Sequence, residues 1–387
     1  MTESDPVVEE VAAATVDTAA EPPTFQASST RRAFLHRASL LSLAIPGIGA
    51  ALSACGLDDK PQHGDTAVVA AQAPPNGKLP RNPDSKLDSS LHAGASATTL
   101  TGGSAQGVVF KRFDPTLPPL STNRTLRLHW KARAVPIRVS DDTVVAGWTF
   151  EGDTPGPLVH CRVGDTVEFT LTNEADMPHS MDFHAAQINP QVAFRSAAKG
   201  ESVSFTYKPH RAGVFLYHCG TAPVLMHIGS GMYGAVVVSP ADPLPAAKEF
   251  VLVEGEMYLG PAVNGVYPFD YNKMLSTLPD FVTFNGRPDQ YAHEPIHVKV
   301  GDRVRFWVAN AGPTHPCAFH VVGEQFDTVY LGTPPGNAIH GVQTFSVAAG
   351  GGMCFEVVCD VPGVFPFVNH AFGHGQKGAI GYLSVDA

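Results

Sequence analysis

The stretch His160-Cys-Arg-Val-Gly-Asp-Thr-Val-Glu-Phe-Thr-Leu-Thr-Asn173 decides the fold, because a close copy of it recurs as His297-Val-Lys-Val-Gly-Asp-Arg-Val-Arg-Phe-Trp-Val-Ala-Asn310. Both copies alternate apolar and polar residues around a Val-Gly-Asp turn, which is typical of neighbouring β-strands. The segments around them are short, rich in Val, Phe and Thr, and bounded by Gly, Pro and Asn. We therefore expect an all-β protein of two tandem Greek-key β-sandwich domains, at residues 108–242 and 243–387.

A metal-binding pattern follows the first copy. The stretch Tyr217-His-Cys-Gly-Thr-Ala-Pro-Val-Leu-Met-His-Ile-Gly-Ser-Gly-Met-Tyr-Gly234 combines a thiol, two imidazoles and a thioether. A thiolate, an imidazole and a thioether suit a blue-copper electron-transfer centre, which needs one more histidine. The upstream segment Pro178-His-Ser-Met-Asp-Phe-His184 can supply it. The predicted ligands of this first copper are His179, Cys219, His227 and Met232.

Strand geometry predicts a second metal site behind the first. Successive side chains of a strand point to opposite faces, so His218 points away from the site that contains Cys219. Asp182 and His184 differ by two residues and share a face. Three histidines around copper leave a position open for water or a small anion, and a carboxylate and a free histidine beside it can deliver protons. The sequence predicts a second copper bound by His184, His218 and His370, flanked by Asp182 and His320.

The second sandwich is expected to differ from the first at the metal sites. Phe319-His320 follows the second repeat as Phe183-His184 follows the first, and Gly363–His370 resembles Gly213–His218. On this alignment His320 and His370 stand at the places of His184 and His218, and Ala371 stands at the place of Cys219. We therefore expect the second sandwich to lack a blue-copper site.

The N-terminus reads as an export signal over residues 1–55. Thr30-Arg-Arg-Ala-Phe-Leu35 carries a twin arginine, and an apolar run with Pro46 and Gly47 follows it. That run is short for a membrane span but suits a signal core. Leu52-Ser-Ala-Cys55 resembles a lipoprotein cleavage site, which predicts a lipid anchor at Cys55 in the periplasm or on the outer face of the cell membrane; a soluble exported protein is the alternative.

Composition bounds the remaining possibilities. Residues 56–107 are rich in Gly, Pro, Ala and Ser and predict a flexible linker. The net charge of −10 and the lack of a basic patch argue against nucleic-acid binding. Four further cysteines are either free buried thiols or include one disulfide, and the sequence does not decide between these: Cys161, Cys317, Cys354 and Cys359.

From about residue 110 to the C-terminus the chain resembles the copper-containing nitrite reductases, and most of all their lipoprotein-type branch. The resemblance rests on His179–Ala185, Tyr217–Gly234, Phe319–Asp327 and Phe367–His370. It implies cupredoxin-like domains, two coppers per chain, and one-electron reduction of nitrite to nitric oxide. The electron donor would be a small cupredoxin or a c-type cytochrome.

The same resemblance implies a homotrimer with the second copper between subunits. His184 and His218 would come from one chain and His370 from its neighbour. It also implies that Asp182 and His320 handle protons and that Val322 is the apolar residue above the anion. One departure is His374, four residues after His370, which competes with it as a candidate ligand.

Two other functions would also use copper ligands of this kind. A laccase-like two-domain multicopper oxidase uses a trinuclear copper cluster built mostly from His-x-His pairs, but this sequence contains no His-x-His, and Gly220 follows Cys219. A non-catalytic copper electron carrier would need neither Asp182 nor the histidines of the second domain. Both alternatives fit the sequence less well than nitrite reduction.

Overall fold

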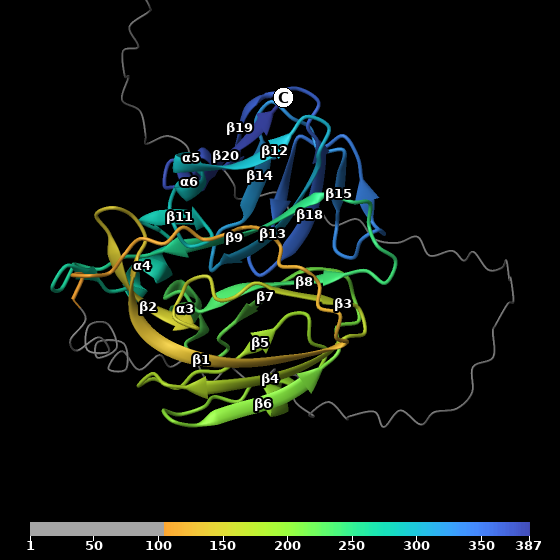
Figure 1. The fold of residues 1–387 in the computed structure, drawn as a ribbon. Helices are drawn as coiled ribbons and strands as arrows, with labels where there is room; N and C mark the ends of the chain where they lie inside the picture. The colour runs from red at the N-terminus through yellow and green to blue at the C-terminus, as the bar shows by residue number, and fades with distance from the viewer. Residues whose placement is uncertain (1–103) are drawn as a thin grey trace, which may run out of the picture. The chain divides into compact units, whose positions relative to one another are not determined.

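The computed structural model describes residues 104–387, and the predicted signal and most of the predicted linker lie outside this range. The described residues form four β-sheets, arranged as two β-sandwiches (Figure 1). Five short helices accompany them: α2 (Pro190–Ala193), α3 (Val224–Gly229), α4 (Tyr271–Ser276), α5 (Gln290–His293) and α6 (Phe372–Gly375). Within residues 104–387, no helix has the length and apolar character needed to cross a membrane.

The first sandwich consists of a five-stranded and a four-stranded sheet. In spatial order the larger sheet contains β10 (Val266–Tyr267), β2 (Val144–Phe150), β1 (Thr125–Arg138), β4 (Thr166–Asn173) and β6 (Ser202–Tyr207). The smaller contains β3 (Val159–Arg162), β8 (Tyr233–Ser239), β7 (Gly213–His218) and β5 (Asp182–Phe183). Every second side chain of β4 is buried, as the alternating pattern predicts.

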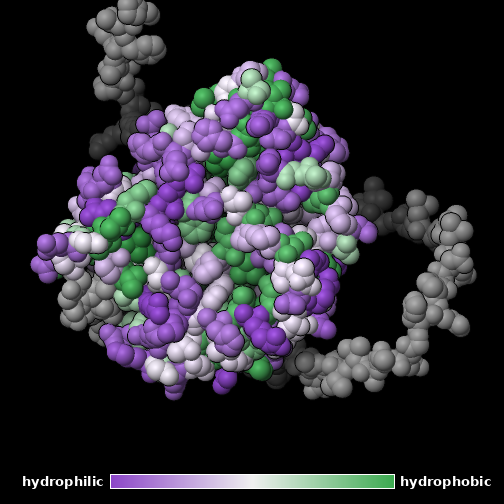
Figure 2. All heavy atoms as spheres, viewed as in Figure 1, coloured by the Kyte–Doolittle hydropathy of each residue, from purple (hydrophilic) through white to green (hydrophobic). Residues whose placement is uncertain are grey.

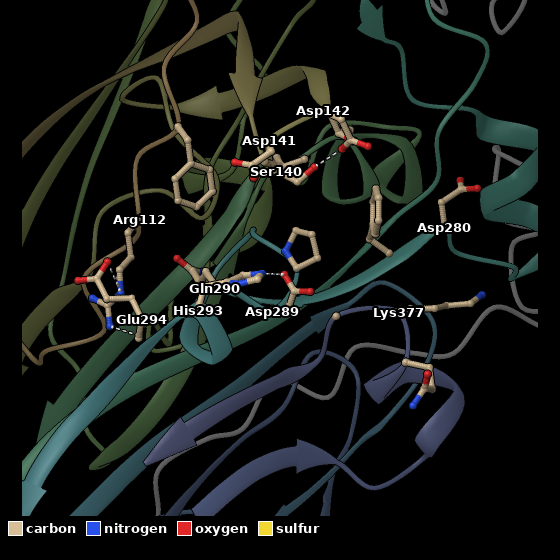
Figure 3. A pocket seen from close by; sticks show the side chains of 17 residues that line it. Arg112, Ser140, Asp141, Asp142, Asp280, Asp289, Gln290, His293, Glu294 and Lys377 are labelled. Atoms are coloured by element: carbon tan, nitrogen blue, oxygen red, sulfur yellow. Dashed lines mark hydrogen bonds and ion pairs between the residues drawn. The ribbon is translucent and has the colours of Figure 1, made fainter. Parts of the chain in front are cut away.

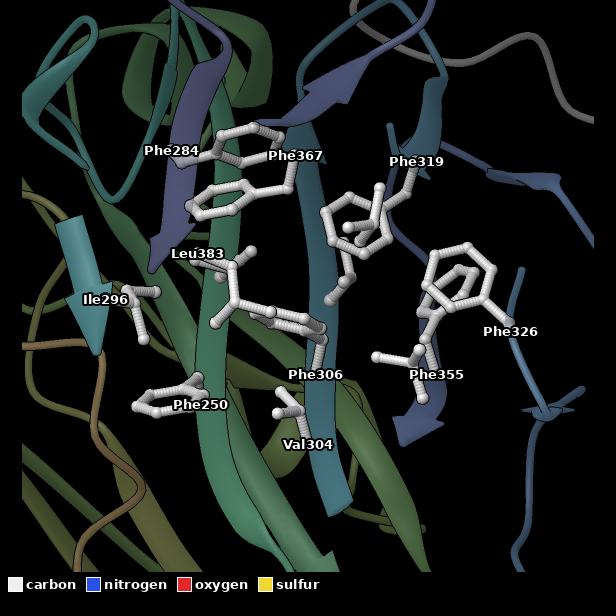
Figure 4. Packing of buried hydrophobic residues seen from close by; sticks show 14 of the residues in the cluster. Phe250, Phe284, Ile296, Val304, Phe306, Phe319, Phe326, Phe355, Phe367 and Leu383 are labelled. Atoms are coloured by element: carbon white, nitrogen blue, oxygen red, sulfur yellow. The ribbon is translucent and has the colours of Figure 1, made fainter. Parts of the chain in front are cut away.

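The second sandwich consists of a six-stranded and a five-stranded sheet. The larger contains β11 (Phe281–Phe284), β9 (Lys248–Met257), β13 (Arg303–Gly312), β18 (Gly352–Val358), β15 (Thr328–Tyr330) and β16 (Ala338–Ile339). The smaller contains β12 (Glu294–Lys299), β20 (Ile380–Asp386), β19 (Gly363–Asn369), β14 (Cys317–Val321) and β17 (Thr344–Val347). Their inner faces enclose an aromatic core in which Phe306, Phe319 and Phe367 lie close together (Figure 4).

A further apolar cluster joins the two sandwiches. Val214 and Leu216 of β7 pack there with Trp307 of β13 and Val251 of β9. The face shown in Figure 2 is mixed, with small groups of hydrophobic residues between hydrophilic ones. Because the large apolar side chains of β7, β9 and β13 are buried between the sandwiches, this contact fixes β7, which carries His218 at its end.

An ion pair adds to this contact. Arg287, which is 2% exposed, donates to the Thr154 carbonyl at 2.5 Å and to Asp153 at 2.6 Å. The first sandwich supplies both acceptors and the second supplies the arginine. These two hydrogen bonds link the sandwiches through a buried guanidinium and a partly exposed carboxylate.

The strand register shows which positions of the two sandwiches are equivalent. Asp182 pairs with His218, five residues after the glycine that begins β7. His320 pairs with Val368, five residues after the glycine that begins β19. The backbone amide of His184 donates to the carbonyl of Leu216, which lies three residues after the glycine that begins β7. The backbone amide of Val322 donates to the carbonyl of Pro366, which lies three residues after the glycine that begins β19. The equivalent pairs are therefore Asp182 and His320, His184 and Val322, and His218 and Val368.

This register corrects the alignment made from the sequence. The prediction that His320 and His370 occupy the places of His184 and His218 is wrong by two residues in both segments. Side chains two residues apart in a strand share a face, so a shift by two preserves the apolar pattern and is invisible to it. The structure instead places the two predicted proton-transfer residues, Asp182 and His320, at equivalent positions.

Candidate metal centres

The first candidate site lies at the end of the first sandwich and is fully buried. The ligand atoms of His179, Cys219 and His227 lie within 4.8 Å of one another. Cys219 Sγ is 3.2 Å from Nδ1 of His227 and 3.8 Å from Nδ1 of His179, and the two Nδ1 atoms are 3.1 Å apart. Two imidazole nitrogens and a sulfur that converge in this way match the donor set of a blue-copper site.

Backbone hydrogen bonds close the loop that carries this site. The amide of Cys219 donates to the Met232 carbonyl at 3.1 Å, and the amide of Met232 donates to the His227 carbonyl at 3.1 Å. His179 is held by reciprocal backbone bonds with Ala197, at 3.1 Å and 2.8 Å. Met232 is fully buried. Because its backbone joins Cys219 to His227, the loop keeps all three residues at one place.

The pKa of the Cys219 thiol is raised, and neighbouring hydrogen-bond donors offset part of the effect of burial. The Ser180 amide donates to Cys219 Sγ at 3.3 Å. Burial raises the pKa of the Cys219 thiol, while hydrogen bonds from Ser180 and Thr221 lower it. A hydrogen bond to sulfur favours the charged form, so these donors favour the thiolate that a metal requires.

Burial also keeps the two histidines neutral, as metal ligands must be. It lowers the pKa of His179 to about 4 and, together with the charge of His179, that of His227 to about 3. In the unfolded chain both groups have a pKa near 6.5, so the unfolded state binds more protons than the folded state below that pH.

We therefore expect the metal-free protein to lose stability as the pH falls below 6.5 and toward 4. At about pH 5.5 the two histidines should lower the free energy of unfolding by about 2.5 kcal/mol relative to pH 7. Urea unfolding of the metal-free protein at several pH values measures this. The variant His179→Gln with His227→Gln is the control, and a slope unchanged by these substitutions would contradict the prediction.

The second candidate site lies on the outer side of the same strands. Ligand atoms of Asp182, His184 and His218 lie within 4.8 Å of one another. The two imidazole Nε2 atoms are 3.0 Å apart, and Asp182 Oδ2 is 4.0 Å from Nε2 of His218. His184 is exposed, whereas His218 is 9% exposed. The predicted division of the two groups between opposite faces is what the structure shows.

The outer hydrogen bonds of these histidines point to a cation between them. His184 Nδ1 lies 3.0 Å from the Gly350 carbonyl, and His218 Nδ1 lies 3.0 Å from the Cys219 carbonyl. A carbonyl accepts, so each Nδ1 carries the proton and each Nε2 presents a lone pair. Two lone pairs that face each other at 3.0 Å repel unless a proton or a metal ion lies between them, and metal-bound histidines make this kind of outer bond.

The other predicted residues of the second site lie together in the second sandwich. The rings of His320 and His370 are 5.3 Å apart between centroids, and Nδ1 of His320 lies 2.5 Å from the Gln343 carbonyl. His370 and Val322 are both exposed, Val322 at 39%. Among the residues that the structure describes, the metal-like cluster around His184 does not include His370. A single chain therefore holds the predicted second site in two halves.

His374 does not join either half. Its Nδ1 lies 3.1 Å from the side-chain nitrogen Nδ2 of Asn369, and its ring packs on that of His315 with centroids 4.8 Å apart. Burial, and then the nearby His315, lower the pKa of His374. These contacts use His374 inside the second sandwich and leave His370 as the exposed histidine of that loop.

Sequence reasoning missed the groups that orient the histidines. Gly350 and Gln343 act through backbone carbonyls, which leave no pattern in the sequence. The cysteine question left open by the sequence has an answer in residues 104–387, where Cys161, Cys219, Cys317, Cys354 and Cys359 are all free and buried.

One cavity lies away from both candidate sites. It has a volume of about 870 Å³ and lies between the turn at Ser140–Thr143 and the segments around Asp289 and Lys377 (Figure 3). Its lining is rich in carboxylates and contains none of the predicted metal ligands. This cavity is therefore not part of either candidate site.

Known proteins resemble this chain in sequence. A family model described as multicopper oxidase matches residues 131–243. The chain is 39% identical over 259 residues to the copper-containing nitrite reductase of Neisseria meningitidis serogroup A, and the match spans 65% of this chain and 67% of the relative. The chain thus spans about two thirds of the length of this relative.

Solved structures share the fold. The copper nitrite reductase from Nitrosomonas europaea superposes with a TM-score of 0.63 at 33% identity, covering 67% of this chain and 94% of that chain. A solved multicopper oxidase gives a TM-score of 0.60 at 24% identity, covering 68% and 86%, which is a likeness of fold alone. The predicted all-β fold of two cupredoxin-like sandwiches is confirmed by these neighbours.

Proposed function

The chain belongs to the copper-containing nitrite reductase family, and from this membership we propose that it reduces nitrite to nitric oxide with one electron, using two coppers per chain. When bound, copper supplies one-electron redox chemistry at both sites and, at the second, a position for the anion. One observation carries the proposal: Cys219 and His218 are adjacent in the sequence, yet each belongs to a different candidate metal cluster. The peptide link between them is the proposed electron path.

His179, Cys219, His227 and Met232 would hold the first copper, and His184, His218 and His370 the second. His184 and His218 turn their Nε2 atoms toward one another, while each Nδ1 lies 3.0 Å from a backbone carbonyl. His370 is exposed and free of the polar contacts that hold His374. These donors fit copper by residue type at both sites.

Asp182 and His320 are the proposed proton donors. Nitrite, one electron and two protons give nitric oxide and water, so the site must deliver two protons for each electron. The Asp182 side chain is 30% exposed and can exchange protons with solvent while lying 4.0 Å from His218. His320 uses Nδ1 on the Gln343 carbonyl, which leaves Nε2 for proton exchange. Val322, equivalent in register to His184, would place an apolar side chain over the anion.

We further propose a homotrimer in which each second site forms between two subunits. Two features support it: the ligand set is split within one chain, and both halves are exposed. His184 and His218 of one subunit would meet His370 and His320 of the next. A cyclic assembly repeats this heterologous contact until the ring closes.

Mixed trimers test the shared site. The variants His184→Ala and His370→Ala should each be inactive alone, because each lacks a ligand at every site. When equal amounts are dissociated and reassembled together, about one quarter of the interfaces should contain both an intact His184 and an intact His370. Nitrite reduction should therefore recover to about one quarter of the wild-type rate; no recovery in confirmed mixed trimers would contradict a site shared between subunits.

The direct test of the function is an anaerobic assay of the copper-loaded chain. Nitrite and a reduced dye should yield one nitric oxide for each electron consumed, with two coppers per chain. The multicopper oxidase match at residues 131–243 makes oxygen reduction the second candidate. It predicts dye oxidation by oxygen and none by nitrite, and the lack of any His-x-His pair weighs against it.

Three further proposals rest on the sequence alone. The donor would be a small cupredoxin or a c-type cytochrome, and the enzyme would work in the periplasm or on the outer face of the cell membrane. The signal and Cys55 lie outside the described residues. Mass spectrometry of the exported protein, with Cys55→Ala as control, would detect a lipid on Cys55.

A further inference from the structure

The second sandwich preserves the backbone framework of the first metal site. In the first sandwich the amide of Cys219 donates to the Met232 carbonyl, and the amide of Met232 donates to His227. In the second the amide of Asn369 donates to the Ala379 carbonyl at 3.0 Å, and that of Ala379 donates to His374 at 3.2 Å. His179 lies three residues before Asp182, as Cys317 lies three before His320. The equivalent pairs are therefore Cys219 and Asn369, His227 and His374, Met232 and Ala379, and His179 and Cys317.

We call these four residues of the second sandwich the relict site: Cys317, Asn369, His374 and Ala379. Hydrogen bonds join its polar side chains. Asn369 Nδ2 lies 3.1 Å from Nδ1 of His374, close to the 3.2 Å that separates Cys219 Sγ from Nδ1 of His227. The same Nδ2 lies 3.0 Å from a carboxyl oxygen of Glu254 on β9. Asn369 has two N–H groups and can serve both acceptors. The amide thus fills the place that the thiolate occupies in the first sandwich.

The other end of Asn369 holds the backbone around His370. Its Oδ1 accepts from the Ala371 amide at 3.0 Å and from the Ala318 amide at 3.1 Å. The amide of His370 itself donates to the Ala318 carbonyl at 2.7 Å. The residue that follows His370 and the neighbouring residue Ala318 are therefore both hydrogen-bonded to the side chain of Asn369, which directly precedes His370 and is 0% exposed.

We propose that the relict site acts as a positioning device for His370, with Glu254 and His374 as positioning residues that orient Asn369. The proposal rests on the proposed role of His370 as a ligand of the second copper. Glu254 and His374 each accept one N–H of Asn369, so the amide has one orientation in which all its hydrogen bonds are made. A longer contact, 3.4 Å from Nδ2 to the Pro316 carbonyl, is the alternative acceptor, so loss of Glu254 or His374 leaves a buried N–H with at best this weaker partner and lets the loop shift.

Glu254 is well suited to this role because it is buried. It is 1% exposed, and burial raises its pKa to about 8, so it is neutral at pH 7. A neutral acid is closely matched in shape and polarity by glutamine, whose carbonyl also accepts from Asn369. Glu254→Gln is therefore the conservative variant, and Glu254→Leu removes the acceptor at similar size.

The test measures copper affinity at each site separately, without nitrite or donor. In Glu254→Leu and His374→Leu, the second-site dissociation constant should rise about 10- to 100-fold, as is common when an outer partner of a ligand is lost. The paramagnetic resonance spectrum of the second copper should change, while the visible absorption of the first copper stays the same. Glu254→Gln should restore near-normal affinity, and His297→Ala, an exposed histidine on β12, should have no effect.

Two results would overturn the proposal. Wild-type affinity at the second site in both leucine variants would show that the contacts do not position His370. Equal weakening of both coppers would show only a general loss of stability. If the wild-type chain itself bound no second copper, the proposed function would fail, which is distinct from a failure confined to the variants.

Discussion

Cys219→Ala is expected to abolish the intense visible absorption of the copper-loaded protein and to reduce donor-driven nitrite reduction to background. The substitution removes the sulfur that lies 3.2 Å from Nδ1 of His227, and with it the thiolate that gives a blue-copper site its colour. It also removes the side-chain end of the proposed electron path to His218. Absorption spectra, copper content and steady-state turnover measure the three consequences.

The second site should survive this change. Asp182, His184 and His218 keep their contacts, because these lie on the other face of the strand. Nitrite should still bind there and perturb the paramagnetic resonance spectrum. Cys161→Ala is the matched control: Cys161 is also a buried free cysteine of the first sandwich, and burial raises its pKa to about 12, so its thiol is inert. A Cys219→Ala protein that stayed blue would refute the assignment of the first site.

Asp182→Asn is expected to slow turnover by about 10²- to 10⁴-fold while both coppers remain bound, which is the usual range for loss of a proton-transfer group. Asparagine has the same shape, so the pairing of residue 182 with His218 in the strand register should persist. Unlike aspartic acid, asparagine has no carboxyl proton to donate. Turnover at saturating nitrite, copper content and the rate of electron transfer between the sites are the measurements.

A matched carboxylate separates this role from a general charge effect. Asp176 belongs to the same sandwich, is exposed at its surface and pairs with Lys199 at 2.6 Å. Asp176→Asn should leave turnover within about twofold, because exposed ion pairs contribute little. If Asp182→Asn turned over at the wild-type rate, Asp182 would not be a proton donor and His320 alone would have to be tested.

The short helix α4 shows how far local signals reach. The structure has α4 at Tyr271–Ser276, with the Asp270 side chain accepting from the Lys273 amide as an N-cap. Capping is a local interaction, so the sequence could predict this helix. The pairing of the two repeats was misplaced by two residues because strand register depends on partners far along the chain.

The sequence by itself determined the two-sandwich fold, the residues of the first site and the division of His218 and Cys219 between opposite faces. It could do so because strand periodicity and ligand spacing are properties of short segments. Only the tertiary structure decided that Asp182 and His320 are equivalent, that Gly350 and Gln343 orient the histidines through carbonyls, and that His374 belongs to a relict site. Those facts depend on which distant backbones meet, and backbone atoms are the same in every residue, so the sequence carries no sign of them.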